Sequence, residues 1–233
     1  MTIAVILAGG LGTRLRSAVP DLPKPMADVR GKPFLEHLIS YWIEQGVTRF
    51  VISVGYKRES IIGYFGQQYK GVPIDYVEEE TPLGTGGGLL LAAKELKDTF
   101  ILLNGDTFFE VQLEALKNFH RSKGSKWTFT LFCANEANRY GGVVLDSNSR
   151  IQSLATAKGD VGALANGGVY LLEPNALSSE KFNVGQKYSL EDEVIPVLLE
   201  SDVPFYGFES VGKFLDIGVS TDYFQAVDIL PQL

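Results

Sequence analysis

The residues best suited to chemistry begin with a glycine-rich segment that carries basic side chains. Residues 7–16 read Leu-Ala-Gly-Gly-Leu-Gly-Thr-Arg-Leu-Arg, and Pro23-Lys24-Pro25 follows. Glycines let backbone N–H groups approach an anion more closely than residues with a Cβ allow. Residues 1–30 carry four Lys or Arg and two Asp, a local charge of +2 in a chain of net charge −7. The segment predicts a site for phosphate groups, and a tight turn with solvated arginines is the competing interpretation.

This segment differs from two common phosphate-binding motifs. It lacks the pattern G-x-x-x-x-G-K-[ST], and Leu15 stands where a dinucleotide fingerprint has its third glycine. Kinases with a P-loop and dehydrogenases are therefore disfavoured.

A second glycine segment, residues 82–88, reads Pro-Leu-Gly-Thr-Gly-Gly-Gly. We expect a loop at the same sheet edge as the first segment, and two such loops can enclose a nucleotide. Three glutamates, residues 78–80, stand just before it. A carboxylate there could accept hydrogen bonds from the N1–H and 2-amino group of guanine, which favours guanine over uracil or thymine. An acidic cap near a helix N-terminus is the alternative.

Two isolated acids end apolar runs far apart in the chain. Asp106 closes Leu-Leu-Asn-Gly-Asp at residues 102–106, and Asp216 follows Phe214-Leu215. Mg²⁺ takes one or two protein carboxylates and completes its shell with substrate phosphates and water. Two such aspartates beside a phosphate loop predict a metal-assisted phosphoryl site, whereas each taken singly is typical of a turn.

The elements that would position these residues alternate between strand and helix. Short apolar runs predict strands at 3–7, 50–54, 74–77 and 100–103, and helical spacing of apolar residues predicts helices at 33–43, 59–65 and 89–96. This alternation is typical of an α/β fold with a doubly wound sheet. Closely spaced strand candidates at 127–132, 143–145 and 169–172 predict a strand-rich second lobe, with helices at 189–199 and at the C-terminus.

Composition narrows the class of protein further. The chain has 233 residues, 45% of them hydrophobic and 21% charged, which is typical of a soluble globular protein. We expect one domain over residues 1–233, with a nucleotide-binding half at 1–125. The acidic balance argues against a nucleic-acid partner, and no apolar stretch reaches the ~20 residues of a membrane span. A single cysteine, Cys133, which we expect in the core, and no signal-peptide pattern predict a cytoplasmic protein.

Taken together, the motifs resemble those of the sugar-1-phosphate nucleotidyltransferase family. The matching stretches are residues 7–15, 23–25, 84–87, 104–106, 166–170 and 216–218, and they span essentially the whole chain. The resemblance implies a Rossmann-like nucleotidyltransferase fold with a mostly parallel, mixed central sheet flanked by helices. It also implies that a sugar 1-phosphate attacks the α-phosphorus of an NTP, giving an NDP-sugar and pyrophosphate with Mg²⁺ as cofactor. The half at 126–233 would then bind the sugar and supply the second metal ligand.

Within the family, residues 16–26, 103–109 and 216–219 with 222–223 look most like guanylyltransferases that act on D-glycero-D-manno-heptose 1-phosphate. GTP and a heptose 1-phosphate are therefore the expected substrates. Guanylyltransferases for mannose 1-phosphate and uridylyltransferases for N-acetylmuramate 1-phosphate are the alternatives. A non-catalytic regulatory protein that binds nucleotide-sugars is an alternative of another class, and assembly into a homo-oligomer stays open.

The resemblance also implies roles for individual residues. Arg14 would neutralise the departing pyrophosphate, Lys24 would stabilise charge at the reacting phosphates, and Asp106 and Asp216 would hold Mg²⁺. The nucleotide-binding positions so implied are Leu7, Ala8, Gly9, Gly10, Gly12, Thr13, Glu79, Pro82, Gly84 and Thr85. The sugar-binding positions so implied are Asn104, Tyr140, Gly141, Lys158, Asn166, Gly167 and Glu191.

One stretch departs from the family pattern. Many relatives place a Glu-Lys pair just after the strand that corresponds to residues 151–154, where this chain reads Ala155-Thr156-Ala157-Lys158. We expect Lys158 to reach the sugar phosphate, and the missing glutamate predicts altered sugar recognition or reduced activity.

Overall fold

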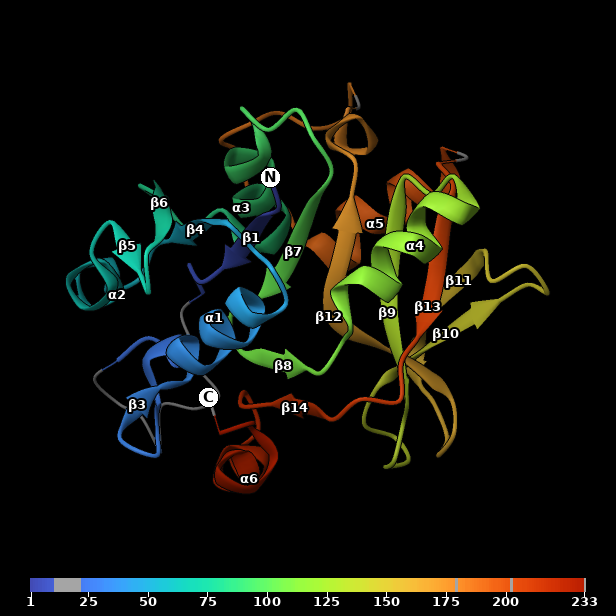
Figure 1. Cartoon of the computed structure of the whole chain (residues 1–233). Helices are drawn as coiled ribbons and strands as arrows, with labels where there is room; N and C mark the ends of the chain where they lie inside the picture. The colour runs from blue at the N-terminus through green and yellow to red at the C-terminus, as the bar shows by residue number, and fades with distance from the viewer. Residues whose placement is uncertain (11–21, 179, 202, 233) are drawn as a thin grey trace.

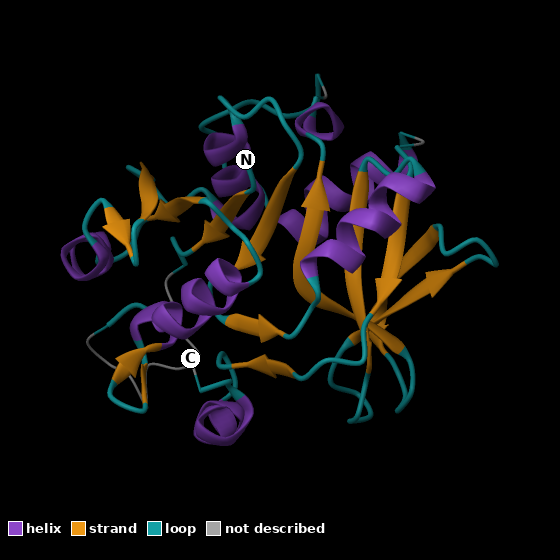
Figure 2. Ribbon diagram, viewed as in Figure 1, coloured by secondary structure: helices purple, strands orange, loops and turns teal. Residues whose placement is uncertain are grey.

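Strand β1 (Ile3–Leu7) lies inside the main sheet because its side chains are apolar on both faces. Ala4 and Ile6 pack in one core with helix α1 (Phe34–Glu44), whereas Ile3 and Val5 pack in a second core with helix α3 (Gly84–Ala93). Figure 2 shows helices on both sides of the sheet. The computed structural model describes residues 1–10, 22–178, 180–201 and 203–232, and at residues 155–158 it describes the backbone.

The other strands of the main sheet come from both halves of the chain. They are β4 (Arg49–Val54), β5 (Gln68–Tyr69), β6 (Val72–Glu78), β7 (Phe100–Asn104), β9 (Trp127–Cys133), β10 (Gly141–Leu145), β11 (Ile151–Lys158), β12 (Leu164–Leu172) and β13 (Phe205–Glu209). Within the described residues the sheet has ten strands in the order β11-β10-β12-β7-β1-β4-β6-β5, with β9 also paired to β12 and β13 paired to β9.

Parallel pairing is concentrated in β6, β4, β1 and β7, while β12 joins β7 and β9 in antiparallel fashion. The predicted α/β fold with a mixed central sheet flanked by helices is confirmed, and the second half is rich in strands as expected (Figure 1). The pairs β10–β11 and β10–β12 are antiparallel as well, so the sheet is less dominated by parallel strands than predicted.

Smaller elements surround this sheet. They are the helices α2 (Arg58–Phe65), α4 (Leu113–Lys123), α5 (Ile195–Glu200) and α6 (Ser220–Ile229), the short turns η2 (Lys24–Met26), η3 (Pro174–Leu177) and η4 (Leu190–Val194), the hairpin β2 (Asp28–Val29) with β3 (Lys32–Pro33), and the ribbon β8 (Thr107–Phe109) with β14 (Phe214–Asp216). Helix α4, the hairpin and β13 have no counterpart in the sequence prediction. None of the helices in the described parts of the chain is long and apolar enough to span a membrane.

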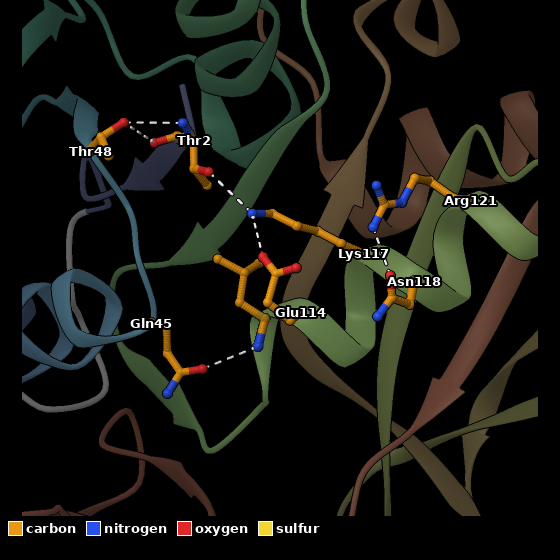
Figure 3. Close-up of polar contacts among 8 residues, drawn as sticks. Thr2, Gln45, Thr48, Glu114, Lys117, Asn118 and Arg121 are labelled. Atoms are coloured by element: carbon orange, nitrogen blue, oxygen red, sulfur yellow. Dashed lines mark hydrogen bonds and ion pairs between the residues drawn. The ribbon is translucent and has the colours of Figure 1, made fainter.

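Helix α4 is held at the amino edge of the sheet by polar contacts (Figure 3). The side chain of Gln45, just after α1, accepts a hydrogen bond of 3.1 Å from Leu113 N and so caps the first turn of α4. Lys117 donates to the hydroxyl of Thr2 at 3.1 Å, next to the start of β1. Thr2 N in turn donates to the Thr48 hydroxyl before β4 at 3.0 Å. These contacts leave the opposite, carboxyl edge of the parallel strands free for a site.

Two predictions from the sequence are wrong at the level of local structure. Residues 84–88, expected as a loop, form the first turns of α3, whose predicted start was residue 89. Glycine is needed there because the segment 186–189 crosses at close range, and a Cβ on Gly87 would lie 2.4 Å from Gln186 O. Cys133, expected in the core, is exposed. It ends β9, and because side chains alternate along a strand it points away from the side on which its buried neighbours Phe132 and Ala134 lie.

Candidate active site

The carboxyl ends of the parallel strands meet at one edge of the sheet. Leu7 is in register with Ser53 of β4 and with Asn104 of β7, and Val54 is in register with Glu78 of β6. The residues that follow these strands therefore converge, as expected for α/β sheets.

A cavity of about 610 Å³ opens at this edge. It is lined by Leu7, Ala8, Gly9, Gly10, Lys24, Pro25, Glu79, Pro82, Gly84, Thr85, Asn104, Asp106, Thr107, Lys187, Glu191 and Asp216. Thirteen of these were candidate site residues on sequence grounds; the other three are Pro25, Thr107 and Lys187. Of these three, Pro25 and Thr107 adjoin predicted residues. Lys187 had no local signal, because only the path of the second half of the chain brings it over α3.

Glu79 lines the end of the cavity that lies beside Gly9, in the first glycine loop (residues 7–16 of the sequence). Glu79 is 8% exposed, and its carboxylate accepts hydrogen bonds from the Ser53 hydroxyl at 2.8 Å and from Leu83 N at 3.0 Å. Gly9 lies against the same carboxylate, and a Cβ on Gly9 would be 2.2 Å from Glu79 Oε1. Glycine at position 9 is thus required for the close approach of the first loop to this buried acid.

The opposite part of the cavity gathers one ammonium and two carboxylates. Lys24 Nζ lies 3.1 Å from Asp106 Oδ2, and the side chains are 11% and 33% exposed. Asp216 Oδ1 accepts a hydrogen bond of 2.7 Å from Gly218 N. A Cβ on Gly218 would lie 2.8 Å from Asp216 Oδ1 and 3.0 Å from Lys24 Nζ, so two of the three charged groups lie against this glycine.

The ribbon β8–β14 brings the two aspartates together. Asp216 pairs with Thr107 in this ribbon, and Ile217 N donates to Asp106 O at 3.1 Å. Gly105 permits the sharp turn before Asp106, because its N–H bonds to Leu7 O at 2.9 Å and a Cβ there would lie 2.6 Å from the same oxygen. The close approach of this turn to the end of β1 therefore explains the glycine of the Asn-Gly-Asp motif.

The two carboxylates suit a hard divalent cation. Two carboxylates that leave positions for phosphate oxygens and water are the donor set that Mg²⁺ prefers. Among the described residues no three His, Cys, Asp or Glu side chains gather into a complete metal site, which a softer, fully protein-bound metal would need. The donors present therefore fit a metal that shares its shell with a substrate.

Glu191 lies on the side of the cavity formed by the second half of the chain. Its Oε2 accepts a hydrogen bond of 3.0 Å from the Thr85 hydroxyl, which itself accepts from Leu190 N at 2.9 Å. Part of the Glu191 residue is exposed to solvent, but its carboxylate is surrounded by the walls of the cavity. This desolvation, more than repulsion from Asp192 and Asp106, raises the pKa of Glu191 above its ordinary value.

The α3 glycines serve structure more than ligand binding. The N–H groups of Gly86 and Gly87 both donate to Tyr188 O, at 2.9 and 3.3 Å. Because these two N–H groups already bond to the chain itself, they are not available to a ligand. Of residues 84–88, Gly84 and Thr85 are the ones in the described lining of the cavity.

Four expected sugar-binding residues lie outside the described lining of this cavity. Asn166 binds the hydroxyl of the buried Tyr170 at 2.7 Å, and Gly167 packs against Phe109. Tyr140 borders a second cavity of about 590 Å³, with Arg139 4.9 Å from its ring centre. Gly141 begins β10 and pairs with Lys158 of β11.

The remaining predicted residues cannot be placed in the site. Gly12, Thr13 and Arg14 lie outside the described residues, as does the side chain of Lys158. Their roles stay predictions.

Comparisons with known proteins give one consistent result. Residues 3–232 match the model of the nucleotidyl transferase family. The chain is 39% identical over 227 residues to the D-glycero-alpha-D-manno-heptose 1-phosphate guanylyltransferase of Aneurinibacillus thermoaerophilus, with 96% of each chain covered. It is 35% identical to the mannose-1-phosphate guanylyltransferase of Mycobacterium tuberculosis, but the match covers 62% of that protein.

A solved structure agrees with the sequence comparisons. HddC from Yersinia pseudotuberculosis superposes with a TM-score of 0.84 at 35% identity, covering 98% of this chain and 99% of the other. HddC has also been solved in complex with GMP-PN, and that structure has the same TM-score at 34% identity. Members of this family generally use a divalent metal ion. With its fold, its clustered motifs and these matches in agreement, the chain belongs to the nucleotidyl transferase family.

Proposed function

We propose that this protein transfers a guanylyl group from GTP to D-glycero-D-manno-heptose 1-phosphate, giving GDP-heptose and pyrophosphate. The convergence of Lys24, Asp106 and Asp216 at one end of a cavity whose other end holds Glu79 carries the proposal. This arrangement offers separate places for reacting phosphates and for a base. The heptose substrate is favoured over mannose because the heptose relatives match along 96% of their length and the mannose relative along 62%.

Lys24 provides positive charge where the phosphates react. Its ammonium is mostly buried beside Asp106, so it acts where water screens charge poorly. We propose that it stabilises the charge that develops on the α-phosphate as an oxygen of the sugar 1-phosphate attacks in line. No covalent intermediate is required, because positioning and charge neutralisation suffice for such a transfer.

Asp106 and Asp216 are the proposed ligands of Mg²⁺. When bound, the ion would neutralise charge on the phosphates of the nucleotide. The ribbon β8–β14 holds the backbones of these aspartates together, and Gly218 N fixes one oxygen of Asp216.

We propose that the nucleotide lies along the first glycine loop. Leu7, Ala8, Gly9 and Gly10 face the cavity, and Gly12, Thr13 and Arg14 would continue the phosphate site from residues outside the described part. Glu79 stands at the base end together with Pro82, Gly84 and Thr85. Its two oxygens already accept hydrogen bonds, and their remaining lone pairs could accept from guanine N1–H and the 2-amino group.

The sugar would then lie between Asn104, Glu191 and the second half of the chain. Tyr140, Gly141, Asn166, Gly167 and Lys158 are the further proposed sugar-binding positions. The division into a nucleotide half at residues 1–125 and a sugar half at 126–233 and the cytoplasmic location remain predictions, and assembly into a homo-oligomer stays open.

The direct test is release of pyrophosphate with Mg²⁺, crossing GTP, UTP, CTP, dTTP and ATP against heptose, mannose, glucose and N-acetylmuramate 1-phosphates. We expect turnover with GTP and the heptose substrate. Turnover with UTP and N-acetylmuramate 1-phosphate would instead make the protein a uridylyltransferase. No turnover anywhere in the grid, from protein shown to be folded, would favour a non-catalytic binding protein.

Substitution of the aspartates tests their assignment. Asp106→Asn and Asp216→Asn should each lower kcat about 100-fold or more, because each removes a charge at the reacting phosphates. Asp98→Asn, an exposed position between α3 and β7, serves as the matched control and should keep wild-type activity. Wild-type turnover in either site variant would refute the metal assignment.

A further inference from the structure

Helix α6 connects three segments that are far apart in the sequence. It follows directly after Asp216 and packs below β14, outside the main sheet, and the hairpin that contains β3 lies nearby (Figure 1). Each of its ends forms polar contacts with a different part of the chain, described below.

The C-terminal end of α6 is capped by Arg30 of the β2–β3 hairpin. The guanidinium donates to Val227 O at 2.9 Å, to Leu230 O at 2.8 Å and to Pro231 O at 3.2 Å. The last carbonyls of a helix have no partners within the helix, and a cation there also compensates the helix dipole. Arg30 itself has a left-handed backbone with φ of 56°, so the turn of the hairpin is shaped to present it.

The same hairpin is directly linked to Lys24. Ala27 N donates to Lys24 O at 2.9 Å at the end of η2, and the hairpin begins at Asp28. The hydroxyl of Tyr223 in α6 donates to Asp28 O at 2.7 Å, which adds a second tie between helix and hairpin. The position of α6 is therefore coupled to the segment that carries the catalytic ammonium.

The N-terminal end of α6 is tied to Asp216 and to the second half of the chain through Asp222. Asp222 is buried, and its carboxylate accepts hydrogen bonds from Arg139 and, at 3.4 Å, from Asp216 N. Val219 N also donates to Asp216 O at 3.2 Å, which closes the turn before the helix. The ion pair between Arg139 and Asp222 is largely buried, with 16% and 10% of the side chains exposed.

We propose that α6 is a clamp that sets Asp216 against Lys24, with Arg30 and Asp222 as its positioning residues. Neither residue lines the cavity, so both act through others. Arg30 fixes the helix to the hairpin that follows Lys24, and Asp222 fixes the start of the helix to the turn after Asp216. The inference rests on the proposed function for the roles of Lys24 and Asp216.

The test compares Arg30→Met with Arg49→Met. Arg49 is a surface arginine that pairs with Asp75 at 2.6 Å at the start of β4, away from α6 and the cavity. For Arg30→Met we expect kcat to fall about tenfold and binding of Mn²⁺ in the presence of GTP, measured by electron paramagnetic resonance, to weaken about fivefold. Binding of a fluorescent guanine nucleotide without metal should stay unchanged, because the Glu79 end of the cavity does not contact α6. Arg49→Met should match wild type in all three measurements.

Three further variants make the test independent of folding losses. Arg30→Lys keeps a donor for the helix carbonyls and should recover part of the Mn²⁺ affinity. Tyr223→Phe removes one hydrogen bond to the same hairpin and should shift kcat and Mn²⁺ binding about threefold in the same direction. Asp222→Asn keeps a hydrogen-bond acceptor near Asp216 but removes the charge that pairs with Arg139, and should weaken Mn²⁺ binding as well.

The proposal is overturned if folded Arg30→Met, or Tyr223→Phe where Arg30→Met does not fold, shows wild-type kcat and wild-type Mn²⁺ binding. If the variants lower only the melting temperature and leave kcat and Mn²⁺ binding unchanged, these residues have a structural role and the proposal is also overturned. Absence of turnover in the wild-type protein would refute the proposed function, whereas the Mn²⁺ titration would still test the clamp because it needs no turnover.

Discussion

Replacement of Gly218 by alanine should damage catalysis far more than stability. A Cβ at this position would lie 2.8 Å from Asp216 Oδ1 and 3.0 Å from Lys24 Nζ. Carbon and oxygen atoms in ordinary contact are about 3.3–3.6 Å apart, so the carboxylate oxygen must move by roughly 0.5–0.8 Å. A misplacement of about 1 Å in a catalytic group can cost about 100-fold in rate, so kcat should fall about 10- to 50-fold.

The cost in stability should be small for the same structural reason. Both contacted atoms are at the ends of side chains that can rotate away, so we expect a loss below about 1 kcal/mol in the free energy of unfolding. The backbone at Gly218 does not have the positive φ that would forbid alanine. Steric displacement of Asp216 and Lys24 is therefore the main expected effect.

The assay pairs kcat, from pyrophosphate release at saturating substrates, with the midpoint of urea unfolding. Gly63→Ala is the matched control because Gly63 lies in α2, and beyond the neighbouring residues and the backbone of its own helix no atom lies within 4 Å of the added Cβ. Within a helix that change should raise stability by about 0.5–1 kcal/mol and leave kcat unchanged. If Gly218→Ala keeps kcat within twofold of wild type, the argument that this glycine makes room for the charged groups is wrong.

Three further outcomes are expected. Gly9→Ala should push Glu79 from its two hydrogen bonds, lowering the free energy of unfolding by about 2–4 kcal/mol in a urea titration and raising KM for GTP. His120 is buried beside the Thr128 hydroxyl, and burial lowers its pKa below 6.5. The unfolded chain therefore binds more protons as pH falls through 6.5, so melting temperatures should decrease between pH 7 and 5, and His120→Gln should flatten this decrease. Lys158→Ala should raise the KM for the sugar 1-phosphate and leave the KM for GTP unchanged; an unchanged sugar KM would remove Lys158 from the sugar site.

The sequence was informative where apolar strands end in polar residues. β1, β4 and β7 are buried runs whose ends were located from residue types, and parallel strands must deliver their carboxyl ends to one edge. The meeting of Gly9, Glu79 and Asp106 in one cavity follows from these features. Asp216 has the same signal, an acid at the end of an apolar run, although its strand β14 is only three residues long.

Features that depend on distant contacts could not be predicted from local pattern. Gly84 to Gly88 read as a loop, yet they form a helix whose glycines accommodate the segment at 186–189. Helix α4 escaped prediction because most of its residues are polar and its buried side chains are few, Leu113, Leu116 and His120. Lys187 enters the cavity only because that same crossing segment carries it there.

The β8–β14 ribbon also constrains when the site can assemble. Asp106 and Asp216 stand 110 residues apart, and the ribbon that joins them closes a loop through nearly half of the chain. Contacts of such long sequence separation form late, since their loop entropy must be overcome first. During synthesis, at roughly 5–20 residues per second of elongation, the two aspartates can meet only after β14 has emerged. A nascent chain stalled before β14 should therefore contain Asp106 without Asp216 beside it.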